Sequence, residues 1–228
     1  MPTSSKSPRP VLDYVDTLFA FPPNRDTMGG TAYLILDQID SQPANILVDC
    51  PAWDAEHLSF LQAHGGVQWL VITHRGGLGK VKEIQTALQC QVVIQEQEAY
   101  LLPEVEVVSF HHDLTLGDRI QVMWTPGHSP GSSCVYDPRQ GGILLTGRHL
   151  LPDRQGHPVP LRTAKTFHWL RQLRSVQAIR DRFSSETLTY LCPGANTGFL
   201  RGQRAIADAY RQVTTIDLEQ AQTAPILL

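Results

Sequence analysis

Two short segments constrain the fold of this chain more than any other part of the sequence. The first is T-H-R-G-G-L-G at residues 73–79, and the second is T-P-G-H-S-P-G-S at residues 125–132. Each follows an apolar run of strand type, at residues 69–73 and 120–124, and its glycines and prolines are typical of a tight loop. We therefore expect His74 and His128 to lie on two loops at strand ends.

The rest of the sequence alternates short apolar runs with helical patterns, which predicts an α/β layered domain. Strands are expected at residues 31–36, 46–48, 69–73, 92–94, 120–124, 133–136, 143–146 and 188–191. Helices are expected at residues 55–64, 79–89, 163–183 and 203–213. Because no linker-like stretch separates the motifs, we expect a disordered tail at residues 1–10 and one domain at residues 11–228.

Composition and charge exclude several classes of function. The formal net charge is -3, so neither nucleic acid nor an acidic membrane surface is an expected partner. The first residues lack the apolar core of a signal peptide, and no apolar run reaches transmembrane length. The four cysteines form no C-x-x-C pair. We expect a cytoplasmic protein with reduced thiols, whose oligomeric state stays open.

The two histidine loops resemble those of the metallo-β-lactamase-fold hydrolases, whose signatures are T-H-x-H-x-D-H and T-P-G-H-T-P-G-S. Two later segments, T-G-R at residues 146–148 and P-G-A at residues 193–195, match the family's T-G-D and P-G-H. The resemblance covers roughly residues 28–200. It implies a four-layer αββα sandwich, with two mixed sheets face to face, helices outside, and all these loops at one edge.

The resemblance also implies that most metal ligands of the family are absent. His74 and His128 stand at two ligand positions. The other positions hold Gly76, Leu78, Gly79, Arg148 and Ala195. Catalytic zinc needs about three protein ligands, and a guanidinium stays charged and repels a cation. We expect no dinuclear centre and no metal cofactor; the alternative is one zinc, iron or manganese ion held by His74, His128 and His149.

Basic residues at the same edge predict an anion-binding pocket. Arg148, Arg75 and Lys80 lie on loops that converge there in this fold. Gly76-Gly77 precedes a predicted helix, whose free N-terminal N–H groups also suit a carboxylate or a phosphate.

His74, His128 and Asp49 complete the predicted pocket. The two histidines are expected to add ring N–H donors, unless they only hold two loops together. Asp49 ends the segment at residues 46–49, and in metal-bearing relatives this residue supports a ligand. Here we expect it to form an ion pair with Arg148 that fills the vacated metal volume, although such buried pairs need not stabilise a fold.

Three hypotheses about function follow. The first is a non-hydrolytic protein that binds an anionic small molecule or a partner through a pocket remodelled around Arg148. The alternative is a metal-dependent hydrolase of thioesters, lactones or phosphoesters with a rearranged mononuclear site. The third is a metal-free enzyme that uses His74 or His128 as a base and Arg148 as an electrophile. The segment at residues 152–160 is expected to form an extended loop beside the pocket, as a lid or a contact surface.

Overall fold

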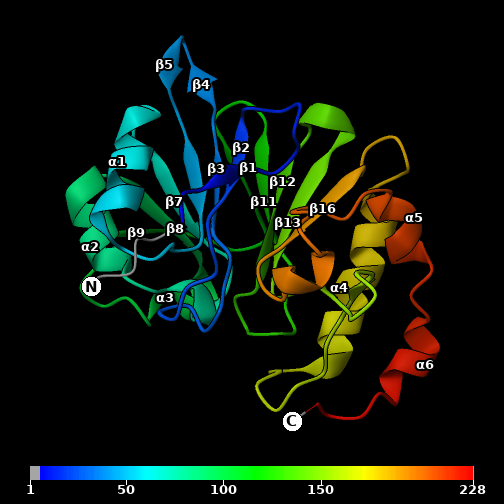
Figure 1. Cartoon of the computed structure of the whole chain (residues 1–228). Helices are drawn as coiled ribbons and strands as arrows, with labels where there is room; N and C mark the ends of the chain where they lie inside the picture. The colour runs from blue at the N-terminus through cyan, green and yellow to red at the C-terminus, as the bar shows by residue number, and fades with distance from the viewer. Residues whose placement is uncertain (1–5, 228) are drawn as a thin grey trace.

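The computed structural model describes residues 6–227 and contains two β-sheets that pack face to face, with helices on both outer faces (Figure 1). This arrangement is the four-layer αββα sandwich that the sequence predicts. Over the described residues, none of the helices is long and apolar enough to cross a membrane.

The first sheet has seven strands. In spatial order they are β1 (Arg9–Pro10), β2 (Leu18–Ala20), β3 (Tyr33–Ile35), β6 (Ile46–Val48), β7 (Trp69–Ile72), β8 (Gln91–Gln95) and β9 (Val107–Phe110). β6 to β9 run parallel, whereas β1, β2, β3 and β6 pair antiparallel. Three helices follow β6, β7 and β8 in turn: α1 (Ala55–Ala63), α2 (Val81–Leu88) and α3 (Glu96–Ala99). Because the sheet is covered on both faces, β6 and β7 consist of buried apolar residues throughout.

The second sheet has five strands: β10 (Asp113–Leu116), β11 (Ile120–Trp124), β12 (Ser133–Asp137), β13 (Ile143–Gly147) and β16 (Tyr190–Pro193). Its neighbours are antiparallel except for the parallel pair β13 and β16. Its helices are α4 (Trp169–Arg182), α5 (Ala209–Thr214) and α6 (Leu218–Gln222). Two small hairpins pair β4 (Gln38–Ile39) with β5 (Gln42–Pro43), and β14 (Leu151–Pro152) with β15 (Pro158–Val159). The 3-10 helices are η1 (Arg75–Gly77), η2 (Arg139–Gly141) and η3 (Thr197–Leu200).

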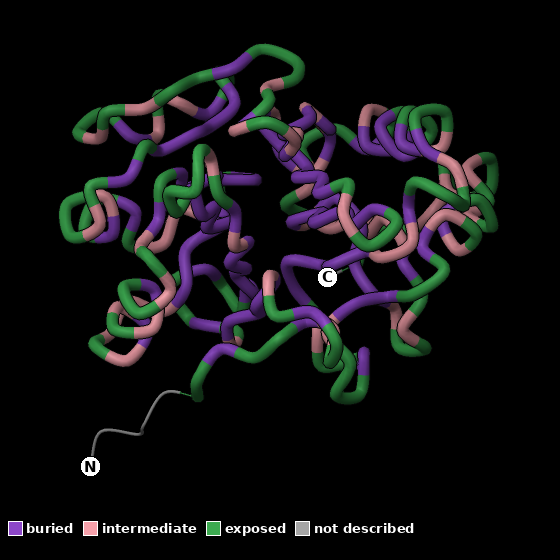
Figure 2. Tube along the Cα trace, turned by 90° about the horizontal axis from the view of Figure 1, so that it is seen from above, coloured by how far each residue is buried: buried purple, intermediate pink, exposed green. Residues whose placement is uncertain are grey.

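Apolar side chains fill three layers, and Figure 2 shows buried chain running through the middle with exposed loops around it. Side chains alternate between layers along a strand, so Ile46 and Val71 enter the layer between the sheets while Leu47 and Leu70 pack against α1 and α2. Burial of one such side chain contributes about 1.5–3 kcal/mol. The strands are therefore a rigid platform for the loops at their ends.

Two helices differ from the predicted ranges. The helix predicted at residues 163–183 begins only at Trp169, because the His168 side chain accepts the N–H of Arg171 and caps the helix. The helix predicted at residues 203–213 is replaced by the shorter α5, because Ile206 pairs with Leu191 beside the second sheet. A local hydrophobic pattern cannot report such a long-range main-chain pairing.

The predicted disordered tail covers residues 1–10, of which 1–5 lie outside the described residues. At Arg9 and Pro10 the structure differs from that prediction. These two residues form β1, which pairs with β2 opposite Phe19 and Ala20.

Candidate functional site

Loops from both sheets meet at one edge of the sandwich. Asp49 follows β6, His74 follows β7, His128 lies between β11 and β12, and Arg148 follows β13. The rings of His74 and His128 stand edge to face with their centroids 5.5 Å apart. The positive charge of Arg148 affects the pKa of both histidines and of Asp49. The structure therefore brings together these four residues of the predicted pocket.

Asp49, Thr73 and His74 form a buried chain of hydrogen bonds. Thr73 donates its main-chain N–H and its hydroxyl to the Asp49 carboxylate, at 2.8 and 2.7 Å. Because the hydroxyl gives its only hydrogen to Asp49, it accepts one from Nδ1 of His74, 2.9 Å away. The network thus assigns a tautomer in which Nε2 of His74 has a lone pair and no hydrogen. The predicted ring N–H donor of His74 is used inside the protein.

Packing around Asp49 requires glycine in the first loop. A Cβ atom at Gly77 would overlap Oδ1 of Asp49. At Gly76, a Cβ atom would lie 3.0 Å from Nε2 of His74 and 3.0 Å from Cε of Met28. Asp49 itself has a φ of 58°, in the left-handed region that few side chains adopt. The glycines of this loop are therefore needed for the close approach to a fixed carboxylate.

Burial keeps the histidines of this edge uncharged at neutral pH. It lowers the pKa of His74 well below the usual value, with a further decrease from His128 and Arg148. Burial and the charges of Arg148 and Arg75 lower the pKa of His128 to about 4. Burial also lowers the pKa of His149 to about 3. The positive charge near His128 is therefore supplied by Arg148, Arg75 and Lys165 and not by the histidine rings.

The Arg148 guanidinium is bound by main-chain oxygens. Nη2 donates to the carbonyls of Met28 and Thr27, at 2.8 and 3.1 Å. The predicted ion pair between Asp49 and Arg148 is wrong. The Asp49 carboxylate accepts hydrogen bonds from Thr73, and the guanidinium donates to carbonyls of the loop before β3. The two groups act on each other only through charge: Arg148 partly offsets the burial that raises the pKa of Asp49 to about 6.

Arg75 and Lys80 are paired with carboxylates. Nε of Arg75 donates to Oε1 of Glu98 at 2.9 Å, and the Glu98 side chain is completely buried. Nζ of Lys80, the residue that precedes α2, lies 3.6 Å from Oε1 of Glu83 in the first turn of that helix, and both side chains are about half exposed. Arg148 is thus the cation of the predicted pocket whose charge is least compensated.

Several buried polar atoms of this edge have no hydrogen-bond partner in the described chain: Nε2 of His74, Nε of Arg148, both ring nitrogens of His149 and Oε1 of Gln172. Such atoms cost free energy unless water or a ligand pairs with them. Gln172 was not among the predicted site residues, although its Nε2 donates to the carbonyl of His149 at 2.9 Å. The sequence signal was a polar residue within the apolar face of the long predicted helix.

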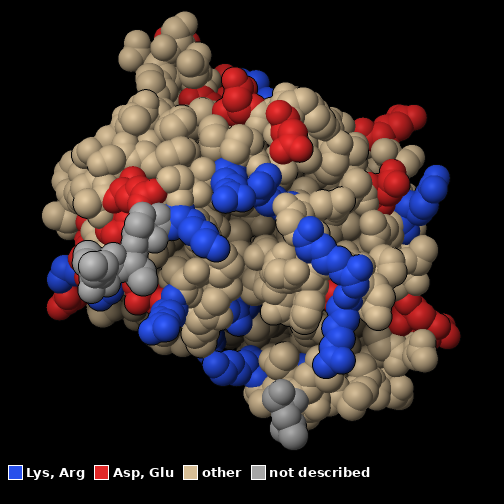
Figure 3. Space-filling model, viewed as in Figure 1, with Lys and Arg blue, Asp and Glu red and all other residues tan. Residues whose placement is uncertain are grey.

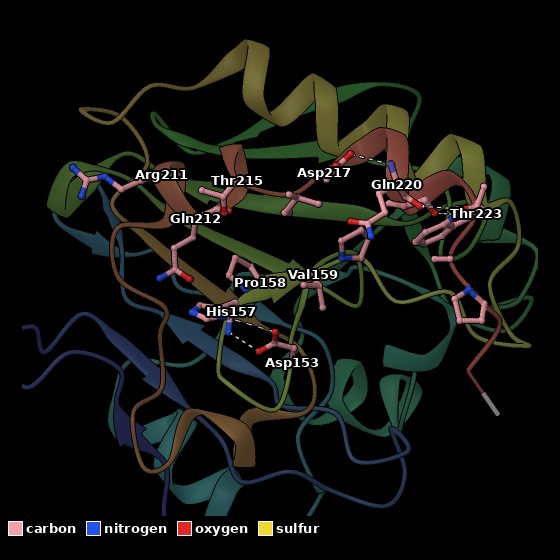
Figure 4. A pocket seen from close by; sticks show the side chains of 16 residues that line it. Asp153, His157, Pro158, Val159, Arg211, Gln212, Thr215, Asp217, Gln220 and Thr223 are labelled. Atoms are coloured by element: carbon pink, nitrogen blue, oxygen red, sulfur yellow. Dashed lines mark hydrogen bonds and ion pairs between the residues drawn. The ribbon is translucent and has the colours of Figure 1, made fainter.

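The segment at residues 152–160, predicted as an extended loop, is instead largely a hairpin. It forms the β14–β15 hairpin, which faces α5 and α6 across a cavity of about 770 Å³ (Figure 4). His74, His128 and Arg148 are not among the residues that line this cavity. Asp153 holds the hairpin turn by accepting the N–H of His157 at 2.9 Å, and Nδ1 of His157 lies 3.8 Å from its carboxylate.

Comparisons with known proteins identify the fold. No family model and no curated protein matches the sequence. Among solved structures, the chain is similar to ETHE1 from Myxococcus xanthus, with a TM-score of 0.64 and 17% identity over 91% of this chain and 92% of that chain. The chain is also similar to an archaeal metallo-beta-lactamase superfamily protein from Sulfolobus tokodaii, with a TM-score of 0.61 and 12% identity over 94% of this chain and 89% of that chain. For TTHA1623 in a di-iron-bound form, the TM-score is 0.61 and the identity is 20%, over 81% of this chain and 92% of that chain. The chain has the metallo-β-lactamase fold.

The metallo-β-lactamase fold confirms the resemblance inferred from the two histidine loops. Across residues 6–227, no group of three or more His, Cys, Asp or Glu side chains could hold a metal ion. The space for a side chain at Gly76 lies between His74 and Met28, and Ala195 is buried without a donor atom. These residues do not fit a two-metal centre, because donor atoms are too few and Arg148 adds a positive charge.

Proposed function

We propose that this protein binds a small anion at Arg148 and does not act as a dinuclear hydrolase. The observation that supports this most is the surroundings of the Arg148 guanidinium. It is partly buried, it donates to the carbonyls of Thr27 and Met28, and its Nε–H is buried without a partner among the described residues. An oxyanion would supply both the missing hydrogen-bond acceptor and the missing negative charge.

The tautomer of His74 narrows the class of ligand. Nε of Arg148 donates a hydrogen bond, whereas Nε2 of His74 accepts one. A ligand that satisfies both must carry a negative oxygen and an oxygen that still has its hydrogen. Hydrogen phosphate and hydroxycarboxylates meet this requirement. A fully deprotonated anion would need protonation of His74, which burial opposes.

The competing proposal is a metal-dependent hydrolase with a mononuclear site. His149 favours it, because both ring nitrogens are buried without partners in the described chain and His128 influences its pKa. Three histidines and a water molecule are a common zinc ligand set. Two observations stand against it. The described residues include no group of three or more His, Cys, Asp or Glu side chains that could hold a metal ion, and the charge of Arg148, which lowers the pKa of His74 and His128, would repel one.

A metal-free enzyme is the weakest of the three hypotheses. His128, with a pKa lowered to about 4, is a poor proton acceptor at neutral pH. His74 shares this weakness, because burial lowers its pKa well below the usual value.

Elemental analysis of protein purified without chelators separates the first two proposals. We expect clearly less than one equivalent of zinc, iron or manganese per chain, because the site offers too few donors beside a fixed cation. A near-stoichiometric metal that disappears in both His128→Leu and His149→Leu would establish the mononuclear site and overturn the binding proposal.

Calorimetric titration with inorganic phosphate tests Arg148 directly. Arg148→Ala should weaken binding by about 1.5–3 kcal/mol, the range for a hydrogen bond to a charged group. Arg154→Ala is the matched control, because Arg154 is an exposed arginine on the β14–β15 hairpin. Equal phosphate affinity in the wild type and Arg148→Ala would reject the proposed role.

We further propose that residues 11–228 form one cytoplasmic domain with neither nucleic acid nor a membrane as partner. The apolar layer between the sheets, to which both sheets contribute, supports the single domain. The four cysteines are buried free thiols, which fits a reducing compartment.

A further inference from the structure

A second cavity, of about 380 Å³, opens beside β2 and β3, and the candidate site uses none of its lining residues. Three basic residues line it: Lys6, Arg9 and Arg204. None of its lining residues is Asp or Glu. Its volume lies within the range of small-molecule sites, about 300–1,000 Å³. We propose that this cavity binds a phosphomonoester with a compact apolar or aromatic body.

The positive charge of this cavity is poorly compensated. Within residues 6–227, the side chains of Lys6 and Arg9 make no hydrogen bond or ion pair. Arg204 donates to the carbonyl of Pro10 at 2.8 Å, and its ion-pair partner Asp13 lies 3.9 Å away with a fully exposed side chain. An exposed pair at that distance contributes little. Because the whole chain has a formal net charge of -3, this concentration of cations is local.

Figure 3 shows the distribution of charge over one face of the molecule. Lys and Arg side chains cross the middle and lower part of that face, whereas Asp and Glu lie mainly near the top and at the sides. A cluster of cations in a hollow attracts a multiply charged anion more strongly than a single carboxylate, because each cation adds to the same potential. A phosphate therefore fits this cavity better than a monocarboxylate does.

The remaining walls suit the two ends of such a ligand. The hydroxyls of Thr31 and Thr197 are 3.2 Å apart, so one of them keeps a hydrogen for a phosphate oxygen. Phe21, Pro22 and Pro23 supply apolar surface in the same cavity, against which a ring can pack. The guanidinium groups of Arg9 and Arg204 can each donate a pair of hydrogen bonds to phosphate.

The cavity and the candidate site are neighbours but use different atoms. Thr31 lines the cavity, and its main-chain N–H donates to the carbonyl of Gly194 at 2.9 Å. Pro23 also lines the cavity and precedes the loop whose carbonyls bind Arg148. A test of the cavity must therefore remove anion binding at Arg148 first.

The experiment is a calorimetric titration with phenyl phosphate in an Arg148→Ala background. Adding Arg9→Gln and Arg204→Gln together should weaken binding at least about tenfold, because two charge-assisted contacts are lost. Arg174→Gln is the matched control, since Arg174 is an exposed arginine on α4 that does not line the cavity. It should leave the affinity within about twofold, the change typical of a distant surface charge. Benzyl alcohol, which lacks the phosphate, should not bind at the same concentrations.

Three outcomes would overturn the proposal. They are an absence of phenyl phosphate binding in the Arg148→Ala background, equal binding after loss of Arg9 and Arg204, and equal binding of benzyl alcohol. Thermal unfolding shows whether each variant is folded. If the double replacement is not folded, Arg9→Gln alone, at an exposed side chain, should still weaken binding about threefold.

Discussion

Arg139 and Arg148 stand before and after the same strand, β13, and their surroundings are opposite. Asp137 accepts from Nε of Arg139 at 2.9 Å and from Nη2 at 2.6 Å, while Nη1 donates to the carbonyl of Leu36. In the described part of the chain, residues 6–227, Arg148 donates only to the two carbonyls of the loop before β3. One guanidinium is neutralised inside the fold, and the other is not.

The pKa values of the two groups report the same difference. Burial acts to lower the pKa of Arg139, but the hydrogen bonds and charge of Asp137 raise it above its usual value. Burial lowers the pKa of Arg148, and the charge of Asp49 opposes this only in part. A structural arginine brings its own carboxylate. An arginine that lacks one at a loop edge is suited to a ligand that supplies it.

The largest expected difference between Arg139 and Arg148 is in what each contributes to stability. Arg139→Ala leaves the Asp137 carboxylate buried without its partner, so we expect a loss of about 3–4 kcal/mol in the free energy of unfolding. Arg148→Ala removes an uncompensated charge together with two hydrogen bonds, and we expect a change within about 1 kcal/mol. Urea unfolding measures both. Equal losses in the two variants would show that Arg148 is also a structural residue.

Acid should destabilise the edge that carries Arg148 through its uncharged histidines. The pKa of His149 is about 3 in the folded protein and about 6.5 in the unfolded chain, so between these values only the unfolded chain binds the proton. The stability due to His149 is therefore complete above pH 6.5 and decreases by about 3 kcal/mol on lowering the pH to 4. Asp49 acts in the opposite direction between pH 3.8 and 6, because its pKa is raised to about 6.

The His149 contribution is isolated by comparing the wild type with His149→Leu. Unfolding by urea at pH 7 and at pH 4 should show that the variant loses about 2–3 kcal/mol less than the wild type. Identical losses would mean that His149 finds a proton acceptor or a water molecule in the folded state.

A smaller effect concerns the loop that fixes Asp49 and His74. A side chain at Gly77 would overlap the Asp49 carboxylate, so Gly77→Ala should cost about 1–3 kcal/mol in stability. Gly198→Ala is the matched control, because a Cβ atom there meets no atom within 4 Å. It should change stability by less than about 0.5 kcal/mol. A neutral Gly77→Ala would show that the loop can move away from Asp49.

The fold could be predicted because close main-chain contacts require the glycines of its signature loops. A Cβ atom at Gly127 would overlap the main chain of Gln172, and one at Gly194 would lie 2.7 Å from Cα of Gly147. Only glycine fits at such close approaches, so a glycine in the sequence indicates each of these tertiary contacts. The edge at which Asp49 and the two histidines meet follows from the same pattern.

The partners of the cations could not be predicted in the same way. Arg75 pairs with Glu98 on α3, and Arg148 donates to a carbonyl oxygen 120 residues earlier in the chain. These choices depend on loop conformations that no local spacing specifies. The pair of Lys80 with Glu83 is the exception, because residues three apart on a helix are neighbours.

The smallest expected effect is that of Arg148→Lys on phosphate affinity. This variant distinguishes the role of the charge of Arg148 from the role of its geometry. Arg148→Lys keeps the positive charge, but one ammonium cannot replace a planar group that donates to two carbonyls and to a ligand at the same time. We expect phosphate affinity to fall about 5- to 10-fold, roughly 1 kcal/mol, with stability unchanged. Calorimetry on the wild type, Arg148→Lys and Arg148→Ala measures this order. Wild-type affinity in Arg148→Lys would mean that charge alone holds the anion, and affinity equal to that of Arg148→Ala would mean that the directed Nε–H does.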